Sequence, residues 1–199
     1  MSTLQAIRAY HVRHAARIWA EHASASNRHL HLPTTIVAYL SLLALAGEVP
    51  LAGGVSLGAL YAGAATLYLL SFDAVVALVL AALSGGLWLS FGGHFALTAF
   101  GPVVGTALPL LVYLAVGQLA LASHRWYGDS FALRPERGLW RVVLITHTVL
   151  FAVGHFVLYA LFHLGYRPAL RARVEADGRA RAQMMKARGG AMTAAGAGA

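Results

Sequence analysis

The chain has no cysteine and few charged residues. The absence of cysteine excludes disulfides, thiolate-bound metals and covalently attached haem. Only 11% of the 199 residues are charged, whereas a soluble domain usually carries about 25%. Hydrophobic residues make up 59% of the chain, so the composition favours a membrane protein over a water-soluble domain.

The few charges are unevenly distributed, and the formal net charge is +8. Basic residues gather in segments 1–31, 123–141 and 167–188, and charge nearly vanishes between them. This pattern is typical of juxtamembrane segments that lie on anionic lipid. Nucleic-acid binding is the weaker interpretation, because so apolar a chain offers no soluble platform for it.

Apolar periodicity and uncharged runs predict an all-α membrane protein. Residues 4–23 alternate apolar and basic positions at helical spacing, which predicts an amphipathic helix in the headgroup plane. Uncharged stretches follow over residues 32–47, 49–72, 74–122 and 142–166. The third is long enough for two helices with a break at Gly101–Pro102. We therefore expect a multi-span transmembrane helical bundle of four to five spans behind the N-terminal amphipathic helix.

The chain divides into three parts on this basis. Residues 1–31 form the interfacial helix and a histidine-rich segment, and residues 32–166 form the bundle, with a polar loop at 123–140. Residues 167–199 are expected to be a basic, disordered tail. Four crossings before the loop would return it to the side of the N-terminus, in agreement with the positive-inside rule. A fifth crossing would place the basic tail on the other side, so the span count stays open.

Local signals predict where the helices begin. The stretch Ser24–Asn27 is expected to break or cap the first helix, and Pro33 to stand in the first turn of the next one. Asp73 is expected to cap a later helix. Ala59 and Gly63 form a pair of small residues four positions apart, which suits close contact between helices.

Three of the ten histidines crowd the last polar stretch before the first apolar run. His22, His29 and His31 stand there with Asn27 and Arg28. Neutral imidazoles bind metal ions, and an amide or a guanidinium can orient them. Spacing alone leaves two interpretations open, a metal site and a polar anchor at the membrane interface.

The remaining histidines have weaker claims. His124 follows the fourth predicted span on the same side as His22, although the aromatic residues beside it also suit an interfacial belt. His11 and His14 lie one turn apart on the first helix, where an exposed pair is more often only solvated. His94 lies inside a predicted span, and a hydrogen-bonded core histidine is the commoner case there. His147, His155 and His163 recur every eight residues and so do not share one helix face.

The pattern His22-x4-Asn27-Arg28-x2-His31, with Trp19 ahead of it, resembles the opening motif of the 2-hydroxy-fatty-acid dioxygenase family. These are small multi-span membrane proteins of fatty-acid α-oxidation. Later parts of the chain carry fainter likenesses, namely Tyr68 with Asp73, His124 with Tyr127, and Leu164 to Arg167.

The second motif departs from the family pattern. Ser123 stands where the family has glycine, and Gly128 stands where it has glutamate. The nearest acid is Asp129, one residue later.

The resemblance implies an Fe(II) ion held by His22, His31 and His124. It implies O2 as co-substrate and a 2-hydroxy fatty acid that is shortened by one carbon. Arg28 would pair with the substrate carboxylate, while Asn27 and Asp129 would orient ligands. The surrounding membrane would be the endoplasmic reticulum in a eukaryote or the inner membrane in a bacterium.

Two other functions stay open at this point. A lipid-binding or membrane-organising protein without catalysis is favoured by the altered second motif, and it would hold no metal. A bis-histidine haem protein would use intramembrane residues such as His94 and His155.

Overall fold

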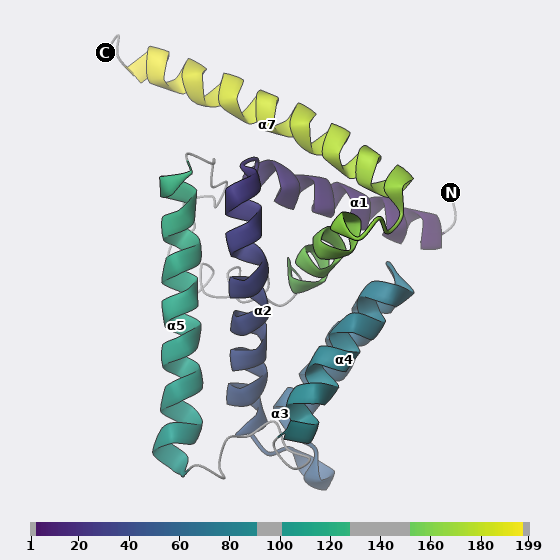
Figure 1. Cartoon of the computed structure of the whole chain (residues 1–199), viewed down its shortest axis with the longest axis vertical. Helices are drawn as coiled ribbons and strands as arrows, with labels where there is room; N and C mark the ends of the chain where they lie inside the picture. Colours follow the sequence, from purple (N-terminus) through teal and green to yellow (C-terminus); the bar gives the residue numbers. More distant parts are fainter. Residues whose placement is uncertain (1–2, 91–100, 128–151, 197–199) are drawn as a thin grey trace.

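The computed structural model describes residues 3–90, 101–127 and 152–196 (Figure 1). Within these ranges the chain is all-helical and forms no strand beyond one isolated bridge, which confirms the predicted fold class. The helices are α1 (Thr3–Glu21), α2 (Ala25–Gly47), the short η1 (Ala52–Gly54), α3 (Leu57–Leu70), α4 (Ala74–Ser90), α5 (Pro102–Trp126), an unlabelled helix over Ala152–His163, and α7 (Pro168–Gly196).

Two layers are visible in Figure 1. Helices α2 and α5 lie side by side, α7 passes above their upper ends, and α1 runs sideways from the upper end of α2 and packs on α7. Helices α3 and α4 form a hairpin beside α2. The buried core joins α2, α3, α4 and the helix over Ala152–His163, and its largest fully buried apolar residues are Tyr39, Leu43, Leu69, Val76, Leu80, Val153 and Leu158.

Short polar side chains begin the helices where the sequence indicates. The Ser24 hydroxyl accepts a hydrogen bond from the Asn27 backbone N–H and caps α2. Asp73 Oδ1 accepts from two backbone N–H groups in the first turn of α4, at 3.0 and 3.2 Å, and caps that helix as predicted. Gly101 and Pro102 begin α5, also as predicted. The Ser24 and Asp73 caps satisfy donors that a helix start leaves unpaired.

The prediction for Pro33 is wrong, because α2 begins eight residues earlier. Pro33 lies inside α2. The Ser24 cap starts the helix before the proline is reached, so the polar histidine segment is itself helical. The small-residue prediction also needs correction. Space around Gly63 is open, and Gly58 is the glycine at the α2–α3 contact, where an added Cβ would meet the Leu43 carbonyl oxygen at 2.7 Å.

The predicted disordered tail is also corrected, since residues 168–196 form α7. Ion pairs one turn apart support this helix, with Glu175 between Arg171 at 2.8 Å and Arg179 at 3.6 Å. Gly178 brings α7 directly onto α1, because a Cβ there would lie 2.5 Å from Cε3 of Trp19. Packing against α1 therefore orders a segment whose composition alone favours disorder.

Two described helices, Ala25–Gly47 and Val104–Trp126, are long and apolar enough to cross a membrane. Only 11% of the apolar stretch of the second helix, Val104–Trp126, is buried. The described portions of the three other apolar helices have 10–17 residues, hence about 15–26 Å against a hydrocarbon core of about 30 Å. The count of four to five spans therefore stays a prediction.

Candidate metal centre

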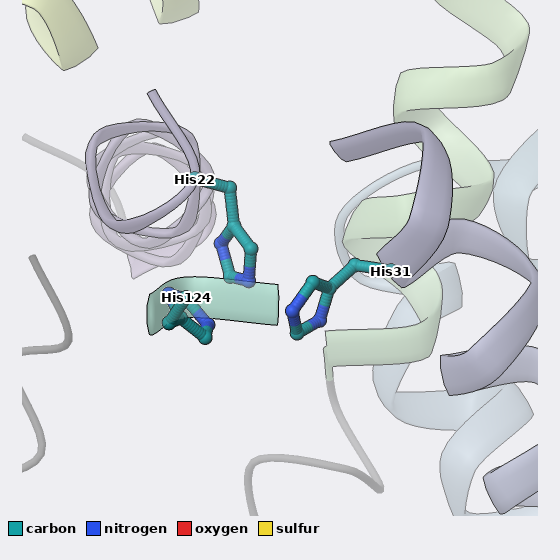
Figure 2. A group of neighbouring side chains, drawn as sticks. All are labelled: His22, His31 and His124. Carbon is teal, nitrogen blue, oxygen red and sulfur yellow. The ribbon is translucent and has the colours of Figure 1, made fainter. Parts of the chain in front are cut away.

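Three buried histidines from distant parts of the chain meet at the upper ends of α2 and α5 (Figure 2). His22 stands in the turn after α1, His31 in the second turn of α2, and His124 in the last turn of α5. One ring nitrogen from each lies within 4.8 Å of the others. The ring centroids are 4.2 to 4.8 Å apart. The structure thus brings together the three residues predicted as ligands, in an arrangement that could bind a metal ion.

The orientation of His22 is set by its own helix. Its Nδ1 lies 2.7 Å from the carbonyl oxygen of Ile18. A carbonyl only accepts, so Nδ1 carries the proton and Nε2 keeps its lone pair. Nε2 is buried and makes no hydrogen bond with the described residues. A metal-binding histidine typically donates its second N–H to a backbone carbonyl in this way.

His31 shows the opposite tautomer. Its Nε2 lies 3.1 Å from the Ala120 carbonyl oxygen and 2.9 Å from Ser123 Oγ. The carbonyl again requires the proton on this nitrogen, so Nε2 donates and Nδ1 keeps the lone pair. These contacts join α2 to the last turns of α5 and hold His31 next to His124.

The orientation of His124 depends on Asn27, a fully buried residue whose amide lies between Ser123 and His124. Ser123 Oγ is 2.6 Å from Asn27 Oδ1 and 2.7 Å from the Ala120 carbonyl oxygen, and one hydroxyl proton cannot serve both. Asn27 Nδ2 is 3.5 Å from His124 Nδ1. Amide oxygen and nitrogen are interchangeable by a half-turn of the group.

As placed, the Ser123 hydroxyl donates to Asn27 Oδ1, the Ala120 carbonyl oxygen accepts from His31 Nε2, and Asn27 Nδ2 faces His124 Nδ1. His124 Nε2 is buried and makes no hydrogen bond with the described residues. With the amide turned by a half-turn, Oδ1 would accept from His124 Nδ1–H and the lone pair of His124 would be on Nε2.

Burial also favours the neutral state. It holds the pKa of His22 well below its usual range, and the neighbouring His31 lowers that pKa further. Neutral imidazole is the form that binds metal. Phe156 closes one side of the group, with its ring stacked on His31 at 5.8 Å and edge-on to His22 at 5.4 Å.

Arg28 holds the turn between α1 and α2. Its Nη1 donates to the carbonyl oxygens of His22 at 2.6 Å and Ala23 at 2.8 Å. Its guanidinium carbon lies 4.7 Å from the ring centre of Trp19 and 5.5 Å from that of Tyr159. The family resemblance implies a substrate carboxylate as the partner of Arg28, whereas the structure places its guanidinium on the backbone that carries His22. We therefore describe Arg28 as a positioning residue.

The other predicted residues are not in this group. His29 is exposed beside His163, with ring centroids 5.4 Å apart. His14 lies 4.9 Å from His155 by ring centroids, in a separate cluster that includes His11. Asp129, His94 and His147 lie outside the described residues. Within the described ranges, His22, His31 and His124 form the only set of three His, Cys, Asp or Glu side chains that lie close enough together to share an ion.

Two contacts in the structure have no counterpart in the sequence predictions. In the sequence, Ser123 is noted only as a departure from the family motif, yet in the structure it contacts both His31 and Asn27. The likenesses at Asp73 and at Tyr166–Arg167 also meet, because Tyr166 Oη donates to Asp73 Oδ1 at 3.0 Å and Arg167 Nη1 donates to Oδ2 at 2.6 Å. A sequence signal for the second contact exists, because Asp73 is a lone acid between the uncharged runs 49–72 and 74–122.

Comparisons with protein-family models, with curated proteins and with solved structures found no match for this chain. The likeness to the dioxygenase family therefore rests on the motif residues.

Proposed function

We propose that this protein is an Fe(II)-dependent membrane dioxygenase that shortens 2-hydroxy fatty acids by one carbon. The observation that supports the proposal most is the meeting of three buried imidazoles, of which His22 and His31 are each held by a hydrogen bond from one ring nitrogen to a backbone carbonyl oxygen. Combined with the motif around Asn27 and Arg28, this group favours oxygen chemistry over a polar anchor.

The donor set fits the proposed metal. Imidazole suits Fe(II), and three protein ligands leave coordination positions for other molecules. When bound, Fe(II) would supply the activation of O2. Three neutral ligands do not compensate the charge of a divalent ion in a buried place, so an anionic partner is favoured. A 2-hydroxy acid brings a carboxylate that meets this need.

The surroundings suit a lipid substrate. Helix α5, which carries His124, is apolar and largely unburied, with Leu108, Leu111 and Leu114 exposed. So large an apolar surface is stable in a bilayer and not in water. We infer that the acyl chain stays in the lipid along α5 while the carboxylate reaches the metal at the boundary. The same surface supports an integral multi-pass location.

Metal content and turnover of one pair of variants test the proposal. The detergent-purified protein is expected to hold about one iron per chain and to consume O2 with a 2-hydroxy fatty acid. His31→Ala is expected to lose both iron and turnover. His29→Ala is the matched control, because His29 is exposed two residues away and should retain both. Turnover in an iron-free preparation, or another metal at full occupancy in the active protein, would contradict the proposal.

A non-catalytic lipid-binding protein is the second candidate, and the altered second motif favours it, because Ser123 and Gly128 stand where the family pattern has glycine and glutamate. A protein of this kind would hold no metal and would tolerate alanine at both His22 and His124. The metal analysis therefore separates the two functions before any substrate is tried.

A further inference from the structure

A separate cavity of about 390 Å³ lies between α1, the α3–α4 connection and the start of α7. This volume falls in the range of about 300–1,000 Å³ that is typical of small-molecule sites. None of the three histidines of the candidate metal centre lines it. Its lining includes Arg8, Val12, Phe72, Arg167, Ala169 and Leu170.

The lining combines an apolar floor with a basic rim. Val12 and Phe72 are buried, and Leu170 is half-buried beside them. The rim carries two arginines, of which Arg8 is exposed on α1 and Arg167 is 51% exposed at the start of α7. A site with these two parts suits an amphipathic anion, with its charge at the rim and its hydrocarbon on the floor.

The positive charge of the rim is not fully neutralised by nearby acids. Asp73 is buried and already accepts from Tyr166, Arg167 and two backbone N–H groups. Arg8 makes no ion pair or hydrogen bond with any described residue. An anionic group between Arg8 and Arg167 would therefore find an uncompensated cation.

The position of the cavity indicates which anion would reach it. Helix α7 passes above the upper ends of α2 and α5, and α1 runs sideways from the upper end of α2 (Figure 1), so both lie at headgroup level if α2 and α5 span the bilayer. We propose that the cavity binds one anionic phospholipid, with its phosphate at Arg8 and Arg167 and its acyl chain on Val12, Phe72 and Leu170. This inference shares the membrane setting of the proposed function but not its metal.

Lipid selectivity of the full chain in detergent tests the proposal. Dihexanoyl phosphatidylglycerol is the anionic probe and dihexanoyl phosphatidylcholine the zwitterionic one. Retention of lipid is followed by native mass spectrometry, and the unfolding midpoint is measured alongside. We expect one phosphatidylglycerol per chain, a raised midpoint, and weaker retention of phosphatidylcholine. Equal retention of the two lipids would overturn the proposal.

Paired variants locate the site. Arg8→Gln is expected to weaken phosphatidylglycerol binding about five-fold. Arg13→Gln makes the same charge change at an exposed position of α1 that does not line the cavity, and should leave binding unchanged. Equal losses in both variants would mean only general attraction to a basic surface and would overturn the site.

A third variant fills the cavity and keeps its charges. Ala169 is exposed on the lining, so Ala169→Trp should abolish retention without disturbing the core. Undiminished binding in this variant would contradict the cavity, and stronger retention of octanoate than of phosphatidylglycerol would contradict the phospholipid. Iron content should be unchanged in all three variants, so a failure here is distinguishable from a failure of the metal proposal.

Discussion

Replacement of Ser123 by alanine tests whether the hydrogen bonds around the three histidines hold them ready for metal. The change removes one hydroxyl from a fully buried position. That hydroxyl lies 2.9 Å from His31 Nε2, 2.6 Å from the Asn27 amide and 2.7 Å from the Ala120 carbonyl oxygen. His31 keeps its second acceptor, Ala120, at 3.1 Å. The Asn27 amide loses its contact with the hydroxyl and with it the orientation toward His124.

The expected loss follows from these contacts. Removing an outer partner of a metal-bound histidine typically lowers metal affinity by about 10- to 100-fold. The buried amide oxygen of Asn27 loses its donor, which costs about 1–3 kcal/mol of stability. Titration of metal-free protein with Fe(II) under anaerobic conditions measures the affinity, and thermal unfolding measures the stability.

Ser84→Ala is the matched control. Ser84 is also a buried helix serine, and its hydroxyl lies 2.8 Å from Tyr39 Oη, away from the histidines. It should lose comparable stability and no metal affinity. Unchanged affinity in Ser123→Ala, or an equal loss in Ser84→Ala, would refute the reasoning about Asn27 and the tautomers.

Three further predictions test the frame around the site. Asp73→Asn should lower the free energy of unfolding by about 2 kcal/mol, since it breaks an ion pair whose arginine is half exposed, while Asp177→Asn on the exposed face of α7 should cost little. Gly178→Val should detach α7 from α1 and expose it to protease, because its side chain would meet Trp19; intact protection would argue against this packing. The lowered pKa of His22 means that the unfolded chain binds more protons than the folded chain below about pH 6.5. Metal-free protein should therefore lose stability as the pH falls below this value, and His22→Gln should flatten that part of a pH–unfolding profile.

The sequence predicts which residues form the candidate site better than it predicts the hydrogen bonds between them. His22 and His31 are separated by one capped turn, so their meeting follows from a short helix break at Ser24. His124 joins them because the helices α2, α3, α4 and α5 bring the chain back, so that the end of α5 lies beside the start of α2. In contrast, Ser123 and Asn27 contact each other only through the register of α5 against α2, and no local pattern encodes that register.

The outer helices show the same limit. Residues 167–199 are rich in alanine, glycine and arginine, which in isolation favours disorder. Burial of Val174 and the close approach at Gly178 make α7 a packed helix, and both depend on a partner far away in the sequence. Pro33 was misplaced for a different reason, since a strong serine cap upstream outweighed the preference of proline for a first turn.

Helix α7 contributes no described ligand, yet it belongs to the frame of the candidate site. Gly178 lets α7 lie on Trp19, and Trp19 in turn lies under the Arg28 guanidinium. Arg28 binds the backbone carbonyl of His22. Each step is a contact between rigid groups. Loss of α7 packing should therefore first free the Arg28 side chain and only afterwards displace the metal ligands. A variant that detaches α7 should therefore differ from a variant of a ligand. In the α7 variant, metal affinity should fall only after the α1–α2 turn has loosened.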